Sequence, residues 1–183
     1  MSARMLVSAA ALIATTVAGA GEPTASPYVG QEARNIKALS SDDVEALRTG
    51  QGMGFAKAAE LNGYPGPAHV LALADQLHLT PEQLARTRAI EASMRSKAKT
   101  IGAELIDAEA QLDTLFASKR VDDRSLQASL RHIGELQSSL RQAHLEAHLA
   151  QTALLDADQT ARYMELRGYE HPSTQDAHQH HRH

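Results

Sequence analysis

The chain of 183 residues carries 22 acidic and 18 basic side chains, a net charge of −4 at pH 7, and no cysteine. The acidic balance is a poor match for nucleic acid, and the absence of cysteine excludes disulfides, thiol chemistry and cysteine-type zinc sites. A hydrophobic fraction of 43% predicts a folded chain. Two Phe, four Tyr and no Trp, beside abundant Ala and Leu, favour packed helices over a β-sheet core.

Residues 1–20 have the pattern of a secretory signal peptide. Arg4 precedes an apolar stretch from Met5 to Val17, and the small residues 18–20 form an A-x-A cleavage site. The stretch is short and rich in Ala and Thr for a membrane-spanning helix, an uncleaved anchor being the alternative. We therefore expect a periplasmic protein with no membrane span after cleavage, leaving 17 basic and 22 acidic residues, net −5.

A flexible leader is expected at residues 21–34, ahead of a helical domain at residues 35–168. Ser40 suits the N-cap of a first short helix, because Asp43 stands at the N3 position and can complete a capping box. Gly50 is expected to end this helix in a left-handed conformation.

Two more short helices are predicted before residue 80. The first covers roughly residues 54–62 and stops at Gly63. The second has Gly66 as its cap and Pro67 at its first position, which needs no amide hydrogen, and is expected to reach about His78.

The stretch HLTPEQLA, residues 78–85, has the pattern of a helix start. Thr80 suits the N-cap, the following proline suits the first helical position, and Gln83 can complete a capping box from the N3 position. Leu79 can supply the apolar contact of a hydrophobic staple. No nearby base would activate Thr80 as a nucleophile, so a structural role is favoured.

Two long helices are predicted, from Pro81 to about Ser118 and, after an N-cap at Asp122, to about Leu154. In each, apolar residues recur at alternating spacings of four and three, the pattern of a packed helical seam. Because the connecting loop is short, the helices must fold back as an antiparallel hairpin. The seam residues are Met94, Ala98, Ile101, Leu105, Ala108, Leu112 and Leu115, then Ile133, Leu136, Leu140, Ala143, Ala147, Ala150 and Leu154.

The second long helix has a further apolar side. Leu145 and Leu149 fall away from Ala143 and Ala147 at about 100° per residue. A thin hairpin cannot bury both sides, so either the short N-terminal helices or a second subunit is expected to cover the extra leucines.

Charge is uneven along the first long helix. Its first half carries five basic residues, Arg86, Arg88, Arg95, Lys97 and Lys99, whereas the second half carries Glu104, Asp107, Glu109 and Asp113. This order opposes the helix dipole, which favours acids first. Two such helices laid antiparallel across a twofold axis would match basic to acidic halves, and a solvated surface without this purpose is the alternative.

A last short helix is predicted after LDADQ, residues 155–159, and is expected to end at Gly168. Leu155 occupies the staple position, Asp156 the N-cap and Gln159 the N3 position. The composition of residues 169–183 predicts a disordered, His-rich tail.

The ten histidines suggest metal binding, since neutral imidazole is a ligand for zinc, copper and nickel. His144 and His148 stand four residues apart and can share one ion, but two ligands need completion by a dimer mate or by the tail, because Glu146 points away. Two exposed histidines at the edge of the seam are the alternative interpretation. The tail candidates are His178, His180, His181 and His183. The remaining helical histidines, His69, His78 and His132, are predicted to be structural, with His78 beside the negative end of a helix dipole.

The two motifs LTPEQ and LDADQ, each opening a helix and bracketing a helical hairpin behind a signal peptide, resemble the LTxxQ-motif periplasmic family. Members include Spy, CpxP and the zinc-associated ZraP, with CnrX-type metal sensors as distant relatives. The resemblance covers roughly residues 35–168, and the second motif departs from it in having Asp156 in place of Thr.

The resemblance implies a four-helix protomer that dimerises into a thin, curved cradle. It also implies ATP-independent chaperone activity on unfolded periplasmic proteins and, in some members, interaction with a sensor kinase or a metal. The five basic residues of the first long helix are our candidates for steering such clients.

We therefore expect a chaperone or envelope-stress adaptor, with a metal buffer or sensor as the alternative. An enzyme is not expected, because the sequence has no Ser/His/Asp order, phosphate loop or H-E-x-x-H helix. No cofactor is required for the leading role, and zinc, copper or nickel would be the ligand in the alternative.

Overall fold

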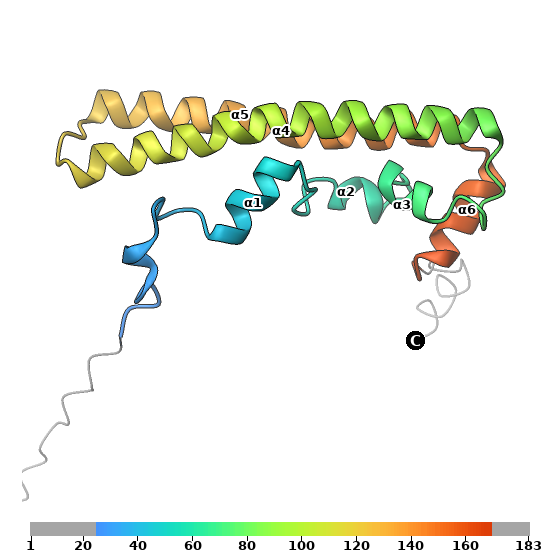
Figure 1. Ribbon diagram of the computed structural model, residues 1–183, viewed down its shortest axis with the longest axis horizontal. Coiled ribbons are helices and arrows are strands. Elements are labelled where there is room, and N and C mark those ends of the chain that lie inside the picture. Colours follow the sequence, from blue (N-terminus) through green and yellow to red (C-terminus); the bar gives the residue numbers. More distant parts are fainter. Residues whose placement is uncertain (1–24, 170–183) are drawn as a thin grey trace, which may run out of the picture.

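The computed structural model describes residues 25–169, which are helical without a strand, so the predicted all-α class is confirmed. Helices α4 and α5 lie side by side as an antiparallel hairpin (Figure 1). The predicted signal peptide and the four candidate metal ligands of the tail lie outside the described residues. In chain order the elements are a 3-10 helix η1 (Gln31–Ala33) and the helices α1 (Ser41–Thr49), α2 (Lys57–Glu60), α3 (Pro67–Ala72), α4 (Pro81–Ala117), α5 (Asp123–Leu154) and α6 (Ala157–Leu166).

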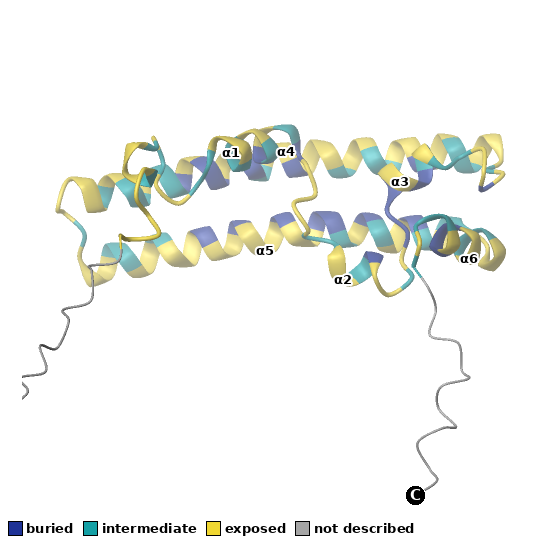
Figure 2. Ribbon diagram, turned by 90° about the horizontal axis from the view of Figure 1, so that it is seen from below, coloured by how far each residue is buried: buried dark blue, intermediate teal, exposed yellow. Residues whose placement is uncertain are grey.

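The short helices α1, α2 and α3 follow one side of the hairpin, and α6 turns away from its open end (Figure 1). Buried side chains therefore gather where α4, α5 and the short helices face one another (Figure 2). In the described part of the chain, no element covers the opposite side of the hairpin (Figure 1).

The predicted ends of α1, α4 and α5 agree with the structure, whereas α2 and α3 are shorter than predicted. Gly50 ends α1 in the expected left-handed conformation, with φ of 70°. Helix α3 ends at Ala72, and the chain continues through turns that bury Leu77. His78 is left-handed, with φ of 49°, and reverses the chain into α4. His78 therefore lies in a turn after α3. The prediction that it lies at the C-terminal end of a helix, beside the negative end of the dipole, is wrong.

Both edges of the predicted domain extend further than expected. Residues 26–33, assigned to the flexible leader, form a turn and η1. Tyr169, assigned to the disordered tail, belongs to the fold, because its hydroxyl donates to the Glu60 carboxylate at 3.2 Å.

The core of the hairpin is the predicted seam. Ala98 and Leu105 of α4 and Leu140 of α5 are almost completely buried in one apolar cluster, together with Leu47 of α1. Gly102 allows α1 to come this close, because a β-carbon at Gly102 would collide with the backbone carbonyl of Leu47. A second cluster at the open end joins α3 to α6 and consists of Val70, Leu77, Tyr163 and Met164.

The seam moves by one residue near the end of α5. Ala150, predicted to be buried, is exposed, and Gln151 is fully buried instead. An α-helix has 3.6 residues per turn, so a strict seven-residue pattern drifts by about 20° per heptad. Over the three heptads of α5 the drift moves the buried side from Ala150 to Gln151.

The extra apolar side of α5 is not covered by the short helices. Leu149 is 57% exposed, and Leu145 is half-buried. Leu149 therefore remains exposed within the described residues, and its cover by a second subunit stays a prediction. Within residues 25–169, no helix is both long and apolar enough to span a bilayer.

Capping boxes start α1, α4, α5 and α6. The sequence predicts both partners of the box for α1, α4 and α6, and for α5 it predicts only the N-cap residue, Asp122. The Thr80 hydroxyl accepts from the Gln83 amide at 3.1 Å, and the Gln83 side chain accepts from the Thr80 amide at 3.0 Å. Asp156 and Gln159 repeat this arrangement at the start of α6. In the α1 box, hydrogen bonds from the Ser40 hydroxyl and backbone hold the pKa of Asp43 below its ordinary value.

The two boxes with a glutamine contact each other. The Gln83 side-chain amide donates to Gln159 at 2.8 Å, and the Gln159 amide donates back to Gln83 at 3.0 Å. The same nitrogens also reach the carbonyls of Leu154 and Leu77, at 3.1 and 3.2 Å. The glutamine pair therefore joins the starts of α4 and α6 to the end of α5 and to the turn before α4.

Replacing Gln83 and Gln159 by Ala, singly and together, tests this glutamine pair. We expect each single change to lower the free energy of unfolding, because partly buried amides and carbonyls lose their partners. The double variant should lose less than the sum, with a coupling energy of about 1 kcal/mol, as for side chains in direct contact. Urea denaturation measures all three values.

The control cycle combines Gln159→Ala with Asp122→Ala, which removes the cap at the other end of the hairpin. These two changes should add to within about 0.5 kcal/mol, because the sites share no partner. Equal coupling in both cycles would show that the glutamine pair has no specific role.

Candidate functional site

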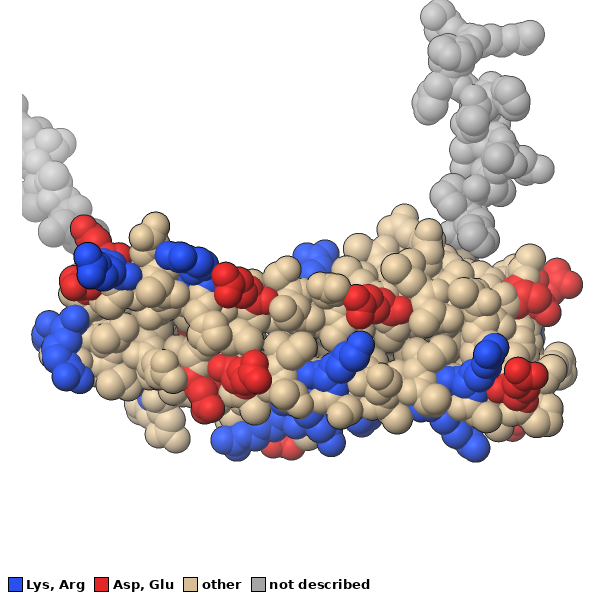
Figure 3. Space-filling model, turned by 90° about the horizontal axis from the view of Figure 1, so that it is seen from above, with Lys and Arg blue, Asp and Glu red and all other residues tan. Residues whose placement is uncertain are grey.

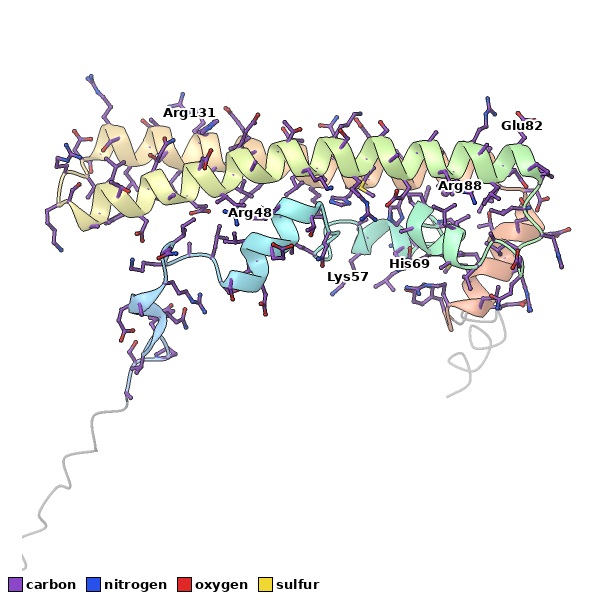
Figure 4. The ribbon with its side chains drawn as sticks, viewed as in Figure 1. Arg48, Lys57, His69, Glu82, Arg88 and Arg131 are labelled. Carbon is purple, nitrogen blue, oxygen red and sulfur yellow. The ribbon has the colours of Figure 1, made fainter. Side chains whose placement is uncertain are left out.

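A cavity of about 530 Å³ lies between the short helices and the middle of the hairpin. Its wall consists of the Gly-rich segment 50–54, α2, the start of α3, and the middle of α4 and α5. His144 and His148 of α5 line it, and His69 of α3 enters from the opposite wall. Figure 4 shows His69 and Lys57 on the short helices that cover this side of the hairpin.

Glu60, at the end of α2, is the polar centre of this region. Its residue is 8% exposed, and one carboxylate oxygen, Oε1, accepts from Tyr163 at 2.6 Å, Tyr169 at 3.2 Å and Arg167 at 3.2 Å. His69 Nδ1 lies 3.4 Å from the same oxygen. The Arg167 charge and the two phenols compensate the buried carboxylate, since an unpaired buried charge is strongly destabilising.

These contacts tie α2 to α6 and the residues after it. Burial and the hydrogen bond to Glu60 raise the pKa of the Tyr163 phenol, which is fully buried and stays protonated as a donor. The other carboxylate oxygen of Glu60, Oε2, is buried without a hydrogen-bond partner. His148 Nδ1 lies 3.9 Å from Oε2.

His148 is held in one orientation. Its Nδ1 lies 2.7 Å from the backbone carbonyl of Tyr64, which can only accept, so Nδ1 carries a hydrogen and donates it. Gly66 packs beside the ring: a β-carbon there would come within 2.8 Å of His148 Cε1.

His144 is buried, one helical turn before His148. It is 4% exposed, stacks on Phe55 with ring centroids 5.8 Å apart, and has no hydrogen-bond partner for Nε2. Burial, followed by the nearby His148, lowers the pKa of His144 below its ordinary value. The imidazole is therefore neutral at neutral pH. The interpretation of this pair as two exposed histidines is wrong, because the short helices cover both rings.

Glu146 points away from the histidine pair, as predicted. It lies 3.8 Å from Lys97 of α4 and accepts from Gln142 at 2.7 Å. Within the described residues, no three His, Cys, Asp or Glu side chains are grouped so that they could hold a metal ion. Completion of a His144–His148 site by the tail or by a second subunit stays a prediction.

The five basic residues of α4 do not form a single strip. At about 100° per residue, Arg86 and Lys97 fall on one side of the helix, and the other three fall on the opposite side. Figure 4 shows Arg88 on the side toward the short helices, and Glu82, whose carboxylate lies 3.9 Å from Arg86, on the other side. The three basic residues on the side toward the short helices are Arg88, Arg95 and Lys99. Of these, Arg95 donates a hydrogen bond to Glu91 at 2.7 Å.

Sequence reasoning missed Glu60 and Tyr163 and found no account for His69. Helix α2 has only four residues, too few to show which side is buried, so nothing in the sequence distinguishes Glu60 from a surface acid. Tyr163 was visible only as one aromatic residue of an amphipathic helix. The short-range patterns predicted the capping residues Leu79, Thr80, Gln83, Leu155, Asp156 and Gln159, but they carried no information on the pairing between the two motifs.

Comparison of the chain with protein-family models, curated proteins and solved structures found no match. The resemblance to the LTxxQ-motif family therefore rests on the two motifs and their helical context, and it stays a prediction.

The lowered pKa of His144 predicts a loss of stability in mild acid. Below about pH 6.5 the unfolded state takes up a proton at this histidine, whereas the folded state does not until the lower, folded pKa is reached. The free energy of unfolding should therefore fall as the pH drops through this window. In His144→Gln, which cannot titrate there, the fall should be smaller.

Urea denaturation at neutral pH and at pH values below this window measures the difference. The matched control is His132→Gln on the same helix, where the histidine is exposed, and it should keep the pH dependence of the unchanged chain. An identical pH dependence in His144→Gln and the unchanged chain would contradict the assignment of a neutral, buried His144.

Proposed function

We propose that this protein is an exported, periplasmic chaperone or stress adaptor that holds unfolded polypeptides without ATP. The observation that supports this role is the exposure of large apolar side chains near the tip of the hairpin. The tip extends beyond α1 (Figure 1). Phe116, near the end of α4, is 51% exposed, and Leu130 of α5 is 52% exposed. A sensor kinase is a further proposed partner if the protein acts as an adaptor.

Loose binding of unfolded chains fits such a surface. Apolar burial depends on area more than on shape, so exposed leucine and phenylalanine side chains can contact many different sequences. From the side opposite the short helices, Lys, Arg, Asp and Glu are interspersed with uncharged side chains over the hairpin (Figure 3). This mixture favours solubility of the unoccupied surface.

The basic residues of α4 would steer acidic segments of a client. Among the described residues, Arg88 and Lys99 have no ion-pair partner within 4.0 Å, so their charges are available. The five basic residues lie on two opposite sides of α4, which favours long-range attraction of a client over a single binding groove. Screening by salt would weaken this attraction.

Exchanging the two apolar tip residues tests the proposal. The variant Phe116→Ser with Leu130→Ser should lose most of the protection of a denaturing model protein against aggregation, measured by light scattering without nucleotide. Its thermal unfolding should change little, because both side chains are already more than half exposed.

The control exchanges two exposed polar residues of the same region, Gln111→Ser with Gln127→Ser, and should protect as the unchanged chain does. If the unchanged protein gives no protection at a several-fold molar excess, the chaperone function is wrong. If the double Ser variant protects fully, the tip is not the client surface.

A homodimer is the proposed state of the protein. Leu149 lies on the side of α5 that faces away from α4, and the short helices leave it exposed. A second copy laid against this side would bury Leu149 and Leu145 on both chains, as an interface with twofold symmetry requires.

Light scattering of the purified protein measures this state, and Leu149→Glu tests the surface. We expect the mass of a dimer for the unchanged chain and a dimer weakened by at least about tenfold in the variant, because a buried glutamate would lack a partner. Gln137→Glu, which adds the same charge at another exposed position of α5, should leave the mass unchanged. A strict monomer at all concentrations would exclude the proposed dimer.

A further inference from the structure

The cavity between the short helices and the hairpin is lined by imidazole and thioether groups, beside the carboxylate of Glu60. Three imidazoles face it, from His69, His144 and His148, and two thioethers line it, from Met53 and Met94. Met53 belongs to the segment between α1 and α2, whereas Met94 belongs to the middle of α4. Four separate parts of the chain therefore contribute nitrogen or sulfur atoms to one cavity.

His148 has the orientation that a metal ligand needs. His148 donates its Nδ1 hydrogen to the Tyr64 carbonyl at 2.7 Å, which is the usual way a protein fixes the ring of a ligating histidine. In the neutral form of that ring, Nε2 is then the nitrogen with the lone pair. The spacing of four residues places the His144 ring on the same side of α5.

The Nε2 atom of His144 is the second independent sign of a ligand. His144 is only 4% exposed, and its Nε2 has no hydrogen-bond partner. Buried polar atoms are nearly always paired. The stack on Phe55 holds the ring in place. A buried, neutral and unpaired imidazole is costly to the fold unless it binds something.

The charges around the cavity select among metal ions. The carboxylate of Glu60 is already compensated by Arg167 and by the hydroxyls of Tyr163 and Tyr169, all on Oε1. Lys57 and Arg95 also line the cavity and oppose additional positive charge. The cost of burying an ion rises steeply with its charge. A cavity in which Arg167 already compensates the one carboxylate, and which Lys57 and Arg95 also line, therefore favours a monovalent ion over a divalent one.

Donor chemistry leads to the same choice. Imidazole binds zinc, nickel and copper alike, but thioether sulfur is a soft ligand that selects Cu(I). We propose that this cavity binds one Cu(I) ion through Nε2 of His144, Nε2 of His148 and the thioether of Met94, with Met53 at the mouth as a further donor. This site needs neither the tail nor a second subunit, and it is independent of the proposed chaperone function.

The test uses the full-length chain in which the four candidate ligands among the five tail histidines are replaced by Asn, namely His178, His180, His181 and His183. Titration with Cu(I) against a chromophoric Cu(I) chelator should show one tightly held ion, and X-ray absorption should show sulfur and nitrogen neighbours. Zinc and nickel should bind more weakly than Cu(I) in parallel titrations.

Met94→Leu preserves the volume of the side chain and removes the sulfur. We expect Cu(I) affinity to fall by at least about tenfold, the smallest loss usual for disturbing a metal site, and the sulfur signal to decrease. Met164→Leu, buried in the second apolar cluster away from the cavity, is the matched control and should change neither value.

Gly66→Ala tests the histidine separately, because the new β-carbon would lie 3.0 Å from His148 Nε2. We expect weaker Cu(I) binding with the circular dichroism of a folded helical protein. Absence of tight Cu(I) binding by the chain with the four Asn substitutions would overturn the proposal. So would tighter binding of zinc, or equal affinity and sulfur signal in Met94→Leu and Met164→Leu.

Discussion

Helix α5 has to pack on two adjacent sides at once, and most of the structure follows from this constraint. One side, with Ile133, Leu140 and Ala147, meets α4 along the hairpin seam. The next side carries His144 and His148, which no hairpin of two helices could cover. Helices α2 and α3 lie along this second side, whereas α1 packs against α4 (Figure 2). The cavity forms where α2 and the start of α3 cross the histidines.

Covering polar side chains with such short helices requires strong local contacts. Helix α2 has four residues and little apolar surface of its own. Its Glu60 carboxylate instead accepts hydrogen bonds from Tyr163 and Arg167, so that one buried charge holds α2 against α6. At the open end, the reciprocal amide contacts of Gln83 and Gln159 join the starts of α4 and α6. The histidine cavity thus lies in a region that side-chain hydrogen bonds hold together.

The same packing leaves two surfaces available for different purposes. Leu149 and the tip residues Phe116 and Leu130 remain exposed, because the short helices follow only one side of the hairpin and end before its tip. The cavity, in contrast, lies between the short helices and the hairpin and opens to solvent past Met53 and Leu61. A client on the outside and a metal ion on the inside would therefore not compete for the same atoms.

The sequence by itself determined the helices that carry their own start signals and long periodic patterns. The boxes at Thr80 and Asp156 and the repeats of α4 and α5 involve residues within a few positions of one another, so local geometry is sufficient to predict them. Tertiary structure alone decided that Gln83 pairs with Gln159, that Glu60 is buried, and that the histidine pair is covered. Each of these depends on residues 70 or more positions apart along the chain, whose approach depends on how the short helices fit onto the hairpin. Even within α5, the drift of a 3.6-residue helix against a seven-residue pattern became visible only when Gln151, and not Ala150, was found in the core.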